Sequence, residues 1–449
     1  MPVSLILLAA GQGTRMNSDL PKVLHPLAGV PLLVHAMRAG AVLGPERVVV
    51  VTGHGAEAVA KAARAEDPEV AVVHQAEQLG TAHAVAQARR ALDGVVGDAV
   101  VLYGDTPFVR PETIEAMLEA RAQHAVVVLG FEAADPGRYG RLVMAGDSLE
   151  RIVEFKDATD AERAIRLCNS GVVCAQASTL FELIDSVGNQ NAAGEYYLTD
   201  IVAIARQKGL SVGVVRCDEA ETLGINTRAE LAGAEAAFQA RMRAEALDLG
   251  VTLIAPETIH FAQDTVIGRD AVVGPNVVFG PGVTVESGAE IRAFCHLEGC
   301  HVSRGAKVGP FARLRPGAEL AEDVHVGNFV EIKAAILDEG AKVNHLSYIG
   351  DAHVGEKTNI GAGTITCNYD GVFKHRTEIG ARAFIGSDTM LVAPVRVGND
   401  AMTGSGSVIT EDVPDGAMAL GRAQQTTKPG LGLRMMQRLR ALKAKKSEG

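Results

Sequence analysis

The sequence predicts two architectures in one chain, an α/β domain with a mostly parallel sheet followed by a parallel β-helix. Strand-like apolar runs alternate with helical segments over residues 1–226, whereas an apolar residue recurs every six positions beyond residue 250. The glycines agree with this change, because 22 of the 49 lie in residues 1–249 and 27 in the shorter remainder. At roughly 150 residues per domain, a chain of 449 residues has room for two or three domains.

Composition and charge exclude several classes of function. The chain has 43 lysines and arginines against 54 aspartates and glutamates, a formal net charge of −11 that argues against a nucleic-acid-binding surface. No apolar run approaches the roughly 18 residues of a membrane span, and Met1–Ala10 lacks the basic start of a signal peptide. The six cysteines form no C-x-x-C pair, so we expect reduced thiols in a cytoplasmic protein and no zinc site.

In the first half, continuous apolar runs separated by helical segments are typical of a sheet covered on both faces. The expected strands are Val3–Ala10, Arg47–Thr52, Val70–His74, Ala99–Tyr103 and Ala125–Phe131. The expected helices are Pro31–Gly40, Ala56–Ala65, Gly80–Leu92 and Pro111–His124. In such sheets ligands bind on the loops that follow the carboxyl ends of the strands.

Three segments follow from the pattern as a whole. Residues 1–226 form the α/β domain, and residues 227–249, rich in Ala, Glu, Arg and Leu, form a helical linker. Residues 250–449 form the β-helix and end in a basic tail from Leu433, for which we expect a solvated helix or a disordered end.

The six-residue repeat of the second half is the signature of a β-helix in which three hexads make one coil and the apolar residue points inward. It begins at Ile267, Val273 and Phe279, and it slips by one residue before Val302 and again before Leu337. Between Thr364 and Glu378 the period is lost, which predicts a loop that projects from the coil.

A glycine-rich turn follows the first expected strand and reads Gly11-Gln12-Gly13-Thr14-Arg15-Met16, with Pro21-Lys22 just beyond. Backbone amides of such a turn can close around a phosphate, and Arg15 and Lys22 can neutralise its charge. It is neither a Walker A loop nor a dinucleotide fingerprint, because no G-K-[ST] follows and Met16 occupies the third glycine position.

This string resembles the signature of sugar-nucleotide pyrophosphorylases, nucleotidyltransferases with a Rossmann-like domain. Further matches follow in order: Gln75–Ala82, Tyr103-Gly104-Asp105, Tyr139-Gly140-Arg141, Ile152-Val153-Glu154, Asn169-Ser170-Gly171 and Gly224-Ile225-Asn226. The resemblance implies that Asp105 and Asn226 bind Mg²⁺ and that Arg15 and Lys22 are catalytic. It implies that UTP or the UDP-sugar contacts Leu8, Ala9, Ala10, Gly11, Lys22, Gln75, Gly80, Thr81, Tyr103, Gly104, Asp105, Gly140, Glu154, Asn169 and Asn226.

The second half carries its own candidate site. His345 and Asp351 lie one hexad apart and could share a face, with Arg315 and Lys333 on nearby turns of the coil. Basic residues, a histidine and a projecting loop near one wall suit an anionic sugar and a general base.

With both sets of motifs, the whole chain resembles the bacterial bifunctional N-acetylglucosamine-1-phosphate uridyltransferases/glucosamine-1-phosphate acetyltransferases. This resemblance implies a left-handed β-helix, a homotrimer, and His345 as the base that deprotonates the glucosamine amine. It implies sugar-phosphate contacts from Arg315, Lys333, Tyr348, Asn359 and Lys374, and acetyl-CoA contacts from Ala362, Asn368, Tyr369, Ser387, Ser405 and Arg422. Before Arg422 this sequence has Gly421 where many relatives have serine.

The expected function is therefore a two-step synthesis of UDP-N-acetylglucosamine for the cell wall, with glucosamine 1-phosphate, acetyl-CoA and UTP as substrates. The first alternative is a sugar-1-phosphate nucleotidyltransferase whose solenoid is only structural or regulatory, which leaves His345 and the loop from Asn368 to Lys374 unexplained. The second, an acetyltransferase with an inactive nucleotide domain, is disfavoured by the intact string from Gly11 to Lys22.

Overall fold

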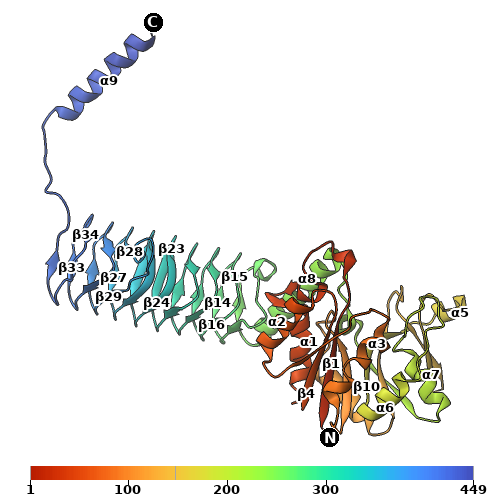
Figure 1. Ribbon diagram of the computed structural model, residues 1–449. Coiled ribbons are helices and arrows are strands. Elements are labelled where there is room, and N and C mark those ends of the chain that lie inside the picture. Colours follow the sequence, from red (N-terminus) through yellow and green to blue (C-terminus); the bar gives the residue numbers. More distant parts are fainter. Residues whose placement is uncertain (1, 147, 448–449) are drawn as a thin grey trace. The chain divides into compact units, whose positions relative to one another are not determined.

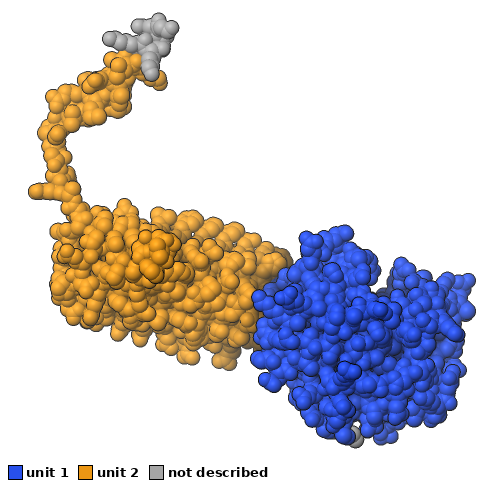
Figure 2. Space-filling model, viewed as in Figure 1, with its two compact units in different colours: residues 1–242 blue, residues 243–449 orange. Residues whose placement is uncertain are grey.

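The structure, a computed structural model, describes residues 2–146 and 148–447. The chain divides into two compact units, residues 1–242 and residues 243–449 (Figure 2). The boundary falls inside the helix α8 (Arg228–Asp248), in the segment for which the sequence predicts a helical linker. The division of activities at residues 226 and 250 stays a prediction.

The first unit is built on a nine-stranded sheet (Figure 1). Seven strands follow the order β11-β7-β10-β6-β1-β4-β5, and the other two, β8 and β9, form a hairpin beside β10. The strands are β1 (Val3–Ala9), β4 (Arg47–Thr52), β5 (Ala71–His74), β6 (Asp98–Tyr103), β7 (Val126–Glu132), β8 (Arg141–Ala145), β9 (Ser148–Val153), β10 (Leu167–Gln176) and β11 (Val212–Cys217). The pairs β1–β4, β1–β6 and β4–β5 are parallel, as predicted. Strand β11, which was not predicted, is parallel to β7. Strand β10, antiparallel to both β6 and β7, was not predicted, because polar residues interrupt its apolar pattern.

Helices cover both faces of this sheet, because alternate residues of each strand point to opposite sides. Leu5 and Leu7 of β1 belong to one apolar core, whereas Ile6 and Leu8 belong to the other. The helices are α1 (Leu32–Ala41), α2 (Ala56–Glu66), α3 (Thr81–Ala86), α4 (Pro111–Arg121), α5 (Asp160–Arg163), α6 (Ala177–Ile184) and α7 (Asp200–Gln207). The helix expected over Gly80–Leu92 is divided into α3 and a 3₁₀ turn at Arg89–Leu92.

The second unit is a parallel β-helix, as the hexads predict. One sheet contains β12 (Thr252–Leu253), β14 (Val272–Val273), β17 (Glu290–Ile291), β20 (Lys307–Val308), β23 (His325–Asn328), β25 (Lys342–His345), β27 (Asn359–Ile360), β30 (Phe384–Ile385), β33 (Met402–Thr403) and β35 (Met418–Ala419). The other contains β13 (Val266–Ile267), β15 (Val278–Phe279), β16 (Val283–Val285), β18 (His296–Leu297), β19 (Cys300–Val302), β21 (Arg313–Leu314), β22 (Ala318–Leu320), β24 (Glu331–Leu337), β26 (Tyr348–Val354), β28 (Ile365–Cys367), β29 (Thr377–Ile379), β31 (Met390–Val392), β32 (Val395–Val397) and β34 (Val408–Ile409).

The register explains the slips in the repeat. Val273 pairs with Ile291 and Ile291 pairs with Val308, so one coil takes 18 residues and the next takes 17. Strands β24 and β26 turn a corner within their length and so join two ladders into one sheet. Residues 17 or 18 apart therefore lie directly above one another through most of the coil, and Ile360 pairs with Ile385, 25 residues on, where the projecting loop intervenes.

The projecting loop is shorter than predicted. Residues 365–367 form β28 and residues 377–379 form β29, so only residues 368–376 leave the coil. The inward positions of these strands are held by threonines, with Thr366 and Thr377 fully buried. A search for aliphatic residues misses them, although their methyl groups fill the same space.

The basic tail forms α9 (Leu431–Ser447), and its side chains through residue 444 are exposed. The side chains of Lys445 and Lys446, part of the predicted basic tail, lie outside the described residues. Among the helices in the described part of the chain, none is long and apolar enough to cross a membrane.

Candidate functional site

The glycine-rich turn after β1 brings Lys22 to the end of the sheet. Gly13 has a φ of +63°, and a Cβ there would lie 2.6 Å from the Cβ of Lys22. Only glycine allows the turn to pack this closely, since both the backbone angle and the contact exclude a side chain. Arg15, on the same turn, is exposed.

A cleft of about 340 Å³ opens at the carboxyl ends of β1 and β6. Ten of the residues assigned to the nucleotide line it: Leu8, Ala9, Ala10, Gly11, Lys22, Gln75, Gly80, Thr81, Tyr103 and Asp105. Val23, Gln78, Ala84 and Glu195 complete the lining. The position agrees with the rule that ligands of parallel sheets bind at the carboxyl ends of strands.

At one end of the cleft, Lys22 contacts two oxygen atoms that accept its hydrogen bonds. Its ammonium group forms an ion pair with the carboxylate of Asp105 and donates a hydrogen bond to Asn226 Oδ1 at 3.0 Å. The side chains of Lys22 and Asp105 are only 13% and 16% exposed, so water screens this pair weakly. Two residues that lie 121 positions apart in the sequence, at 105 and 226, thus present oxygen atoms to one cation.

At another end, a loop and the start of α3 form a closely packed wall. The side chain of Gln75 is buried, and its Nε2 donates to the carbonyl oxygen of Gly80 at 3.1 Å. Gly80 has a φ of +119°, and a Cβ there would lie 2.5 Å from the carbonyl oxygen of Tyr196. Burial raises the pKa of the Tyr103 phenol, which therefore stays protonated and able to donate a hydrogen bond.

A second cavity of about 180 Å³ is lined by Arg138, Glu154, Phe155, Lys156, Ala193, Glu195 and Tyr197. Because Glu195 lines both, the two cavities adjoin. The carbonyl oxygen of Gly140 accepts a hydrogen bond from the amide of Asn169 at 2.9 Å, and a Cβ on Gly140 would lie 3.4 Å from Glu154 Oε1. The three residues assigned to the sugar are thus neighbours. Burial raises the pKa of the Glu154 carboxyl.

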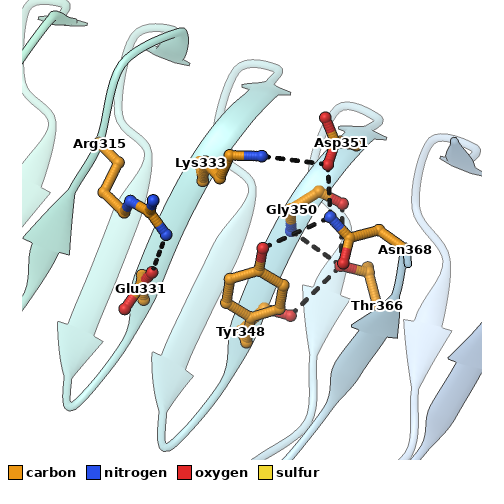
Figure 3. Close-up of polar contacts among 8 residues, drawn as sticks. All are labelled: Arg315, Glu331, Lys333, Tyr348, Gly350, Asp351, Thr366 and Asn368. Carbon is orange, nitrogen blue, oxygen red and sulfur yellow. Dashed lines mark hydrogen bonds and ion pairs between the residues drawn. The ribbon is translucent and has the colours of Figure 1, made fainter. Parts of the chain in front are cut away.

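On the second unit, polar side chains from successive coils form a cluster around Tyr348 (Figure 3). Lys333 lies 3.3 Å from Asp351 Oδ2, and the amide of Asn368 contacts the same carboxylate and donates to the Tyr348 hydroxyl at 3.4 Å. Arg315 pairs with Glu331 at 2.8 Å. Lys374, on the projecting loop, lies beside the cluster, because its interaction with Lys333 raises the pKa of Lys333 and lowers the pKa of Lys374.

The partner of His345 is Asn328, one coil below it, rather than Asp351. The imidazole Nδ1 lies 2.9 Å from Asn328 Oδ1, and because that oxygen accepts, Nδ1 carries the proton and Nε2 is the acceptor. The expectation that His345 and Asp351 share a face is wrong. His345 ends β25 in one sheet and Asp351 lies in β26 of the other, because six residues advance the chain by one side of the coil.

Four of the six residues assigned to acetyl-CoA form a stripe up the coils beyond this cluster, whereas Asn368 belongs to the cluster and Tyr369 lies on the projecting loop. The amide of Asp388 donates to the carbonyl of Ala362 at 2.7 Å, and the amide of Gly406 donates to the carbonyl of Ser387 at 2.8 Å. Arg422 then donates to the carbonyl of Ser405 at 2.7 Å. Ala362, Ser387, Ser405 and Arg422 therefore stand on successive coils.

Comparisons with known proteins agree on both halves of the chain. Residues 5–174 match the MobA-like NTP transferase domain family, and residues 264–299 match the bacterial transferase hexapeptide family of six repeats. A bifunctional protein GlmU of Cereibacter sphaeroides is 76% identical over 99% of this chain and 98% of its own length. Those of Ruegeria sp. and Paracoccus denitrificans are 70% and 71% identical, over 100% and 98% of this chain and 100% and 99% of their own lengths.

The chain belongs to the bifunctional GlmU family. It is a bifunctional transferase with nucleotidyltransferase and acetyltransferase activities in the synthesis of UDP-N-acetylglucosamine. The alternatives with a purely structural solenoid or an inactive nucleotide domain are thereby set aside. Nucleotidyltransferases of the GlmU family act with a divalent metal ion.

Three polar residues at the two GlmU sites were missed from the sequence: Gln78 and Glu195 in the first unit and Asn328 in the second. Gln78 donates to the carbonyl of Ala10 at 2.9 Å and so closes the glycine-rich turn. Glu195 precedes Tyr196 and Tyr197, two of the six tyrosines of the chain, and this aromatic pair was an available signal. Asn328 could be found only from the 17-residue register that places it beneath His345.

Glycine at position 421 has a steric reason. A Cβ at this position would lie 2.1 Å from the carbonyl oxygen of Val408, so the chain packs here only with glycine. Arg422 follows directly and stays bonded to Ser405.

Proposed function

We propose that the cleft at the ends of β1 and β6 binds UTP and that the adjoining cavity binds N-acetylglucosamine 1-phosphate. The observation that supports this best is that ten residues from separate motifs line one cleft. Gln75, Gly80 and Thr81 then surround the uracil, while Gly140, Glu154 and Asn169 hold the sugar.

In this account, the sugar-phosphate oxygen attacks the α-phosphorus of UTP and pyrophosphate leaves. Both reactants are anions, so the chain must supply positive charge and alignment. Lys22 and Arg15 neutralise the charge that develops on the phosphates, and the amides of the glycine-rich turn add donors without a mobile side chain.

We further propose that Asp105 and Asn226 hold Mg²⁺. Their oxygens already face one ammonium group, and carboxylate and amide oxygens are the donors that a hard cation prefers. When bound, the metal would neutralise phosphate charge. Lys22 would then leave the two oxygens and turn to the phosphates.

At the second site, His345 Nε2 takes a proton from the amine of glucosamine 1-phosphate. The amine nitrogen attacks the thioester carbon of acetyl-CoA, a C–N bond forms, and the C–S bond breaks. The leaving thiolate takes a proton from the imidazolium of His345, so coenzyme A is released as the thiol and the base is restored. Asn328 holds the imidazole in the required tautomer. Arg315, Lys333 and Lys374 meet the sugar phosphate together with Tyr348 and Asn359, and Asn368 and Tyr369 contact acetyl-CoA along with the stripe from Ala362 to Arg422.

The hexapeptide unit suggests an oligomer, and we propose a homotrimer in the cytoplasm whose acetyl sites are shared between neighbouring coils. Mass measurement in solution checks the trimer.

The assignment of the two sites is tested with the pure chain. Glucosamine 1-phosphate and acetyl-CoA should release free thiol, and N-acetylglucosamine 1-phosphate with UTP and Mg²⁺ should release pyrophosphate. Undiminished thiol release from His345→Ala would contradict the assignment of the acetyl site.

A further inference from the structure

Arg141, the first residue of β8, is a buried charge that the proposed reaction does not use. Its exposed fraction is 2%, and it is one of the largest fully buried side chains of the chain. Arginine is almost never fully buried unless its charge is met by a partner. The groups that meet this guanidinium therefore show what it does.

All of the hydrogen-bond acceptors of Arg141 are backbone carbonyls. The guanidinium donates to the carbonyls of Tyr139 and Gly137, the latter at 3.0 Å, and through Nε and Nη2 to the carbonyl of Arg163 at 3.3 and 3.2 Å. No ion pair recorded among the described residues includes Arg141. The planar guanidinium of Arg141, which has five N–H groups, thus donates to three carbonyl oxygens. These hydrogen bonds fix the backbone that carries the carbonyls.

Two of these carbonyls belong to the turn that leads into Gly140. The turn from Gly137 to Tyr139 precedes Gly140, which bonds to Asn169 on one side and faces the carboxylate of Glu154 on the other. The turn contains a glycine at positive φ, Gly137 at +44°, and two hydrogen bonds of its own, from the amide of Gly137 to Asp135 Oδ1 at 3.1 Å and from the amide of Tyr139 to the carbonyl of Pro136 at 3.2 Å. Arg141 adds bonds to the carbonyls of Gly137 and Tyr139, which tie the turn to the start of β8.

The same guanidinium also reaches the strand end that carries Glu154. The centre of the Arg141 guanidinium lies 6.0 Å from the ring of Phe155, the residue after Glu154, and Arg163 lies 4.9 Å from that ring. Arg141 therefore contacts the segments that present two of the three proposed sugar contacts.

We propose that Arg141 is a positioning residue for uridylyl transfer, which holds Gly140 and Glu154 in place for the sugar 1-phosphate. The inference rests on the proposed sugar roles of Gly140, Glu154 and Asn169. Lysine cannot substitute, because an ammonium group is a compact charge with three donors and cannot span carbonyls on two segments.

The test compares Arg141→Lys and Arg141→Met with Arg166→Met. Arg166 is an exposed arginine that donates a bond to one carbonyl, that of Ala133, at 2.9 Å, so it controls for the loss of an arginine nearby. Both Arg141 variants should raise the KM for N-acetylglucosamine 1-phosphate on the order of 10-fold, since small misplacements of binding groups are costly. The KM for UTP and the rate of acetyl transfer should stay at the wild-type values, as should all three quantities in Arg166→Met.

A KM for the sugar that is unchanged in Arg141→Lys overturns the inference. An equal rise in the KM for UTP also overturns it. So does loss, in both variants, of the thermal unfolding transition of the first unit measured by calorimetry, because either outcome assigns Arg141 a general structural role. The variant Gly140→Ala distinguishes an error in the role of Arg141 from an error in the proposed sugar site. Its added methyl lies 3.4 Å from Glu154 Oε1, and an unchanged sugar KM in that variant would contradict the proposed sugar site itself.

Discussion

The two candidate sites of this chain are built in opposite ways. The first is a concave cleft, lined mainly by loops at the ends of parallel strands, where glycines such as Gly13 and Gly80 let backbone approach the ligand. The second is a set of side chains on the outside of a coil, where His345 is exposed and each neighbour comes from another turn.

The charged pairs show this difference only in part. Lys22 and Asp105 are 13% and 16% exposed, and at the second site Arg315 and Glu331 are 35% and 30% exposed, but Lys333 and Asp351 are 17% and 22% exposed. The first site lies among loops at the ends of strands, while the second lies on the outer surface of a coil. Because the two sites belong to different units of the chain, they should respond independently to substitution.

The largest expected effect is at the first site. Asp105→Ala removes an oxygen that faces Lys22 and, in our proposal, Mg²⁺, and uridylyl transfer should fall on the order of 10³-fold. Acetyl transfer should be unchanged, with pyrophosphate and thiol release measured on the same preparation. Asp93→Ala, at an exposed loop acid, should leave both rates alone. Loss of both activities in Asp105→Ala would contradict the independence of the two sites.

The corresponding change at the second site is His345→Ala, which should lower acetyl transfer on the order of 10²-fold because the general base is lost. The matched control is His353→Ala. That imidazole lies in β26 and pairs with Asp338 at 2.8 Å and with Glu378 at 3.3 Å, neither of which belongs to the Tyr348 cluster. Equal losses in the two variants, measured by thiol release, would argue against a catalytic role for His345.

A smaller effect is expected for Lys333→Ala, which removes the cation beside Asp351. The KM for glucosamine 1-phosphate should rise on the order of 10-fold while kcat changes less, since the residue binds the phosphate and not the reacting amine. Lys342→Ala, on the exposed side of β25, serves as the control. A change confined to kcat would contradict the binding role.

The smallest effect concerns stability and pH. Burial raises the pKa of Glu154, so the folded state binds this proton more tightly than the unfolded state, and stability falls as pH rises from the ordinary carboxyl pKa through the raised one. Glu154→Gln should therefore stabilise the first unit at neutral pH by less than about 1 kcal/mol. Calorimetry across pH checks this, and a lower melting temperature at neutral pH would contradict it.

Glu162 provides the opposite sign in the same unit. Its bonds to Thr159, in a capping box at the start of α5, lower its pKa to about 2. The stability that it contributes is present above the ordinary carboxyl pKa and is lost as pH falls toward about 2. Glu162→Gln should accordingly destabilise the first unit at neutral pH and make no difference in strong acid.

Sequence reasoning reached different depths in the two units. Periodicity was enough to predict the coil and its slips, because each apolar residue occupies a repeated inward position. It missed β28, since Thr366 is polar in name but buries a methyl group. In the first unit, β10 was hidden by Asn169 and Ser170, polar residues in a strand that also carries part of the site.

The site residues follow the same division. The strings around Gly11, Gly80 and Asp105 are contiguous and could be recognised locally, and the structure gathers them in one cleft. Contacts that depend on register could not be found this way. The bond between His345 and Asn328 and the buried hydrogen bonds of Arg141 depend on the three-dimensional fold, because the local sequence does not indicate which carbonyl or amide lies opposite.

The most direct test of two independent sites on one chain is complementation between Asp105→Ala and His345→Ala. Each variant alone, given glucosamine 1-phosphate, acetyl-CoA, UTP and Mg²⁺, should form almost no UDP-N-acetylglucosamine. A mixture of the two should form it readily, because N-acetylglucosamine 1-phosphate made by the first variant diffuses to the intact cleft of the second. A mixture as inactive as its components would contradict the account.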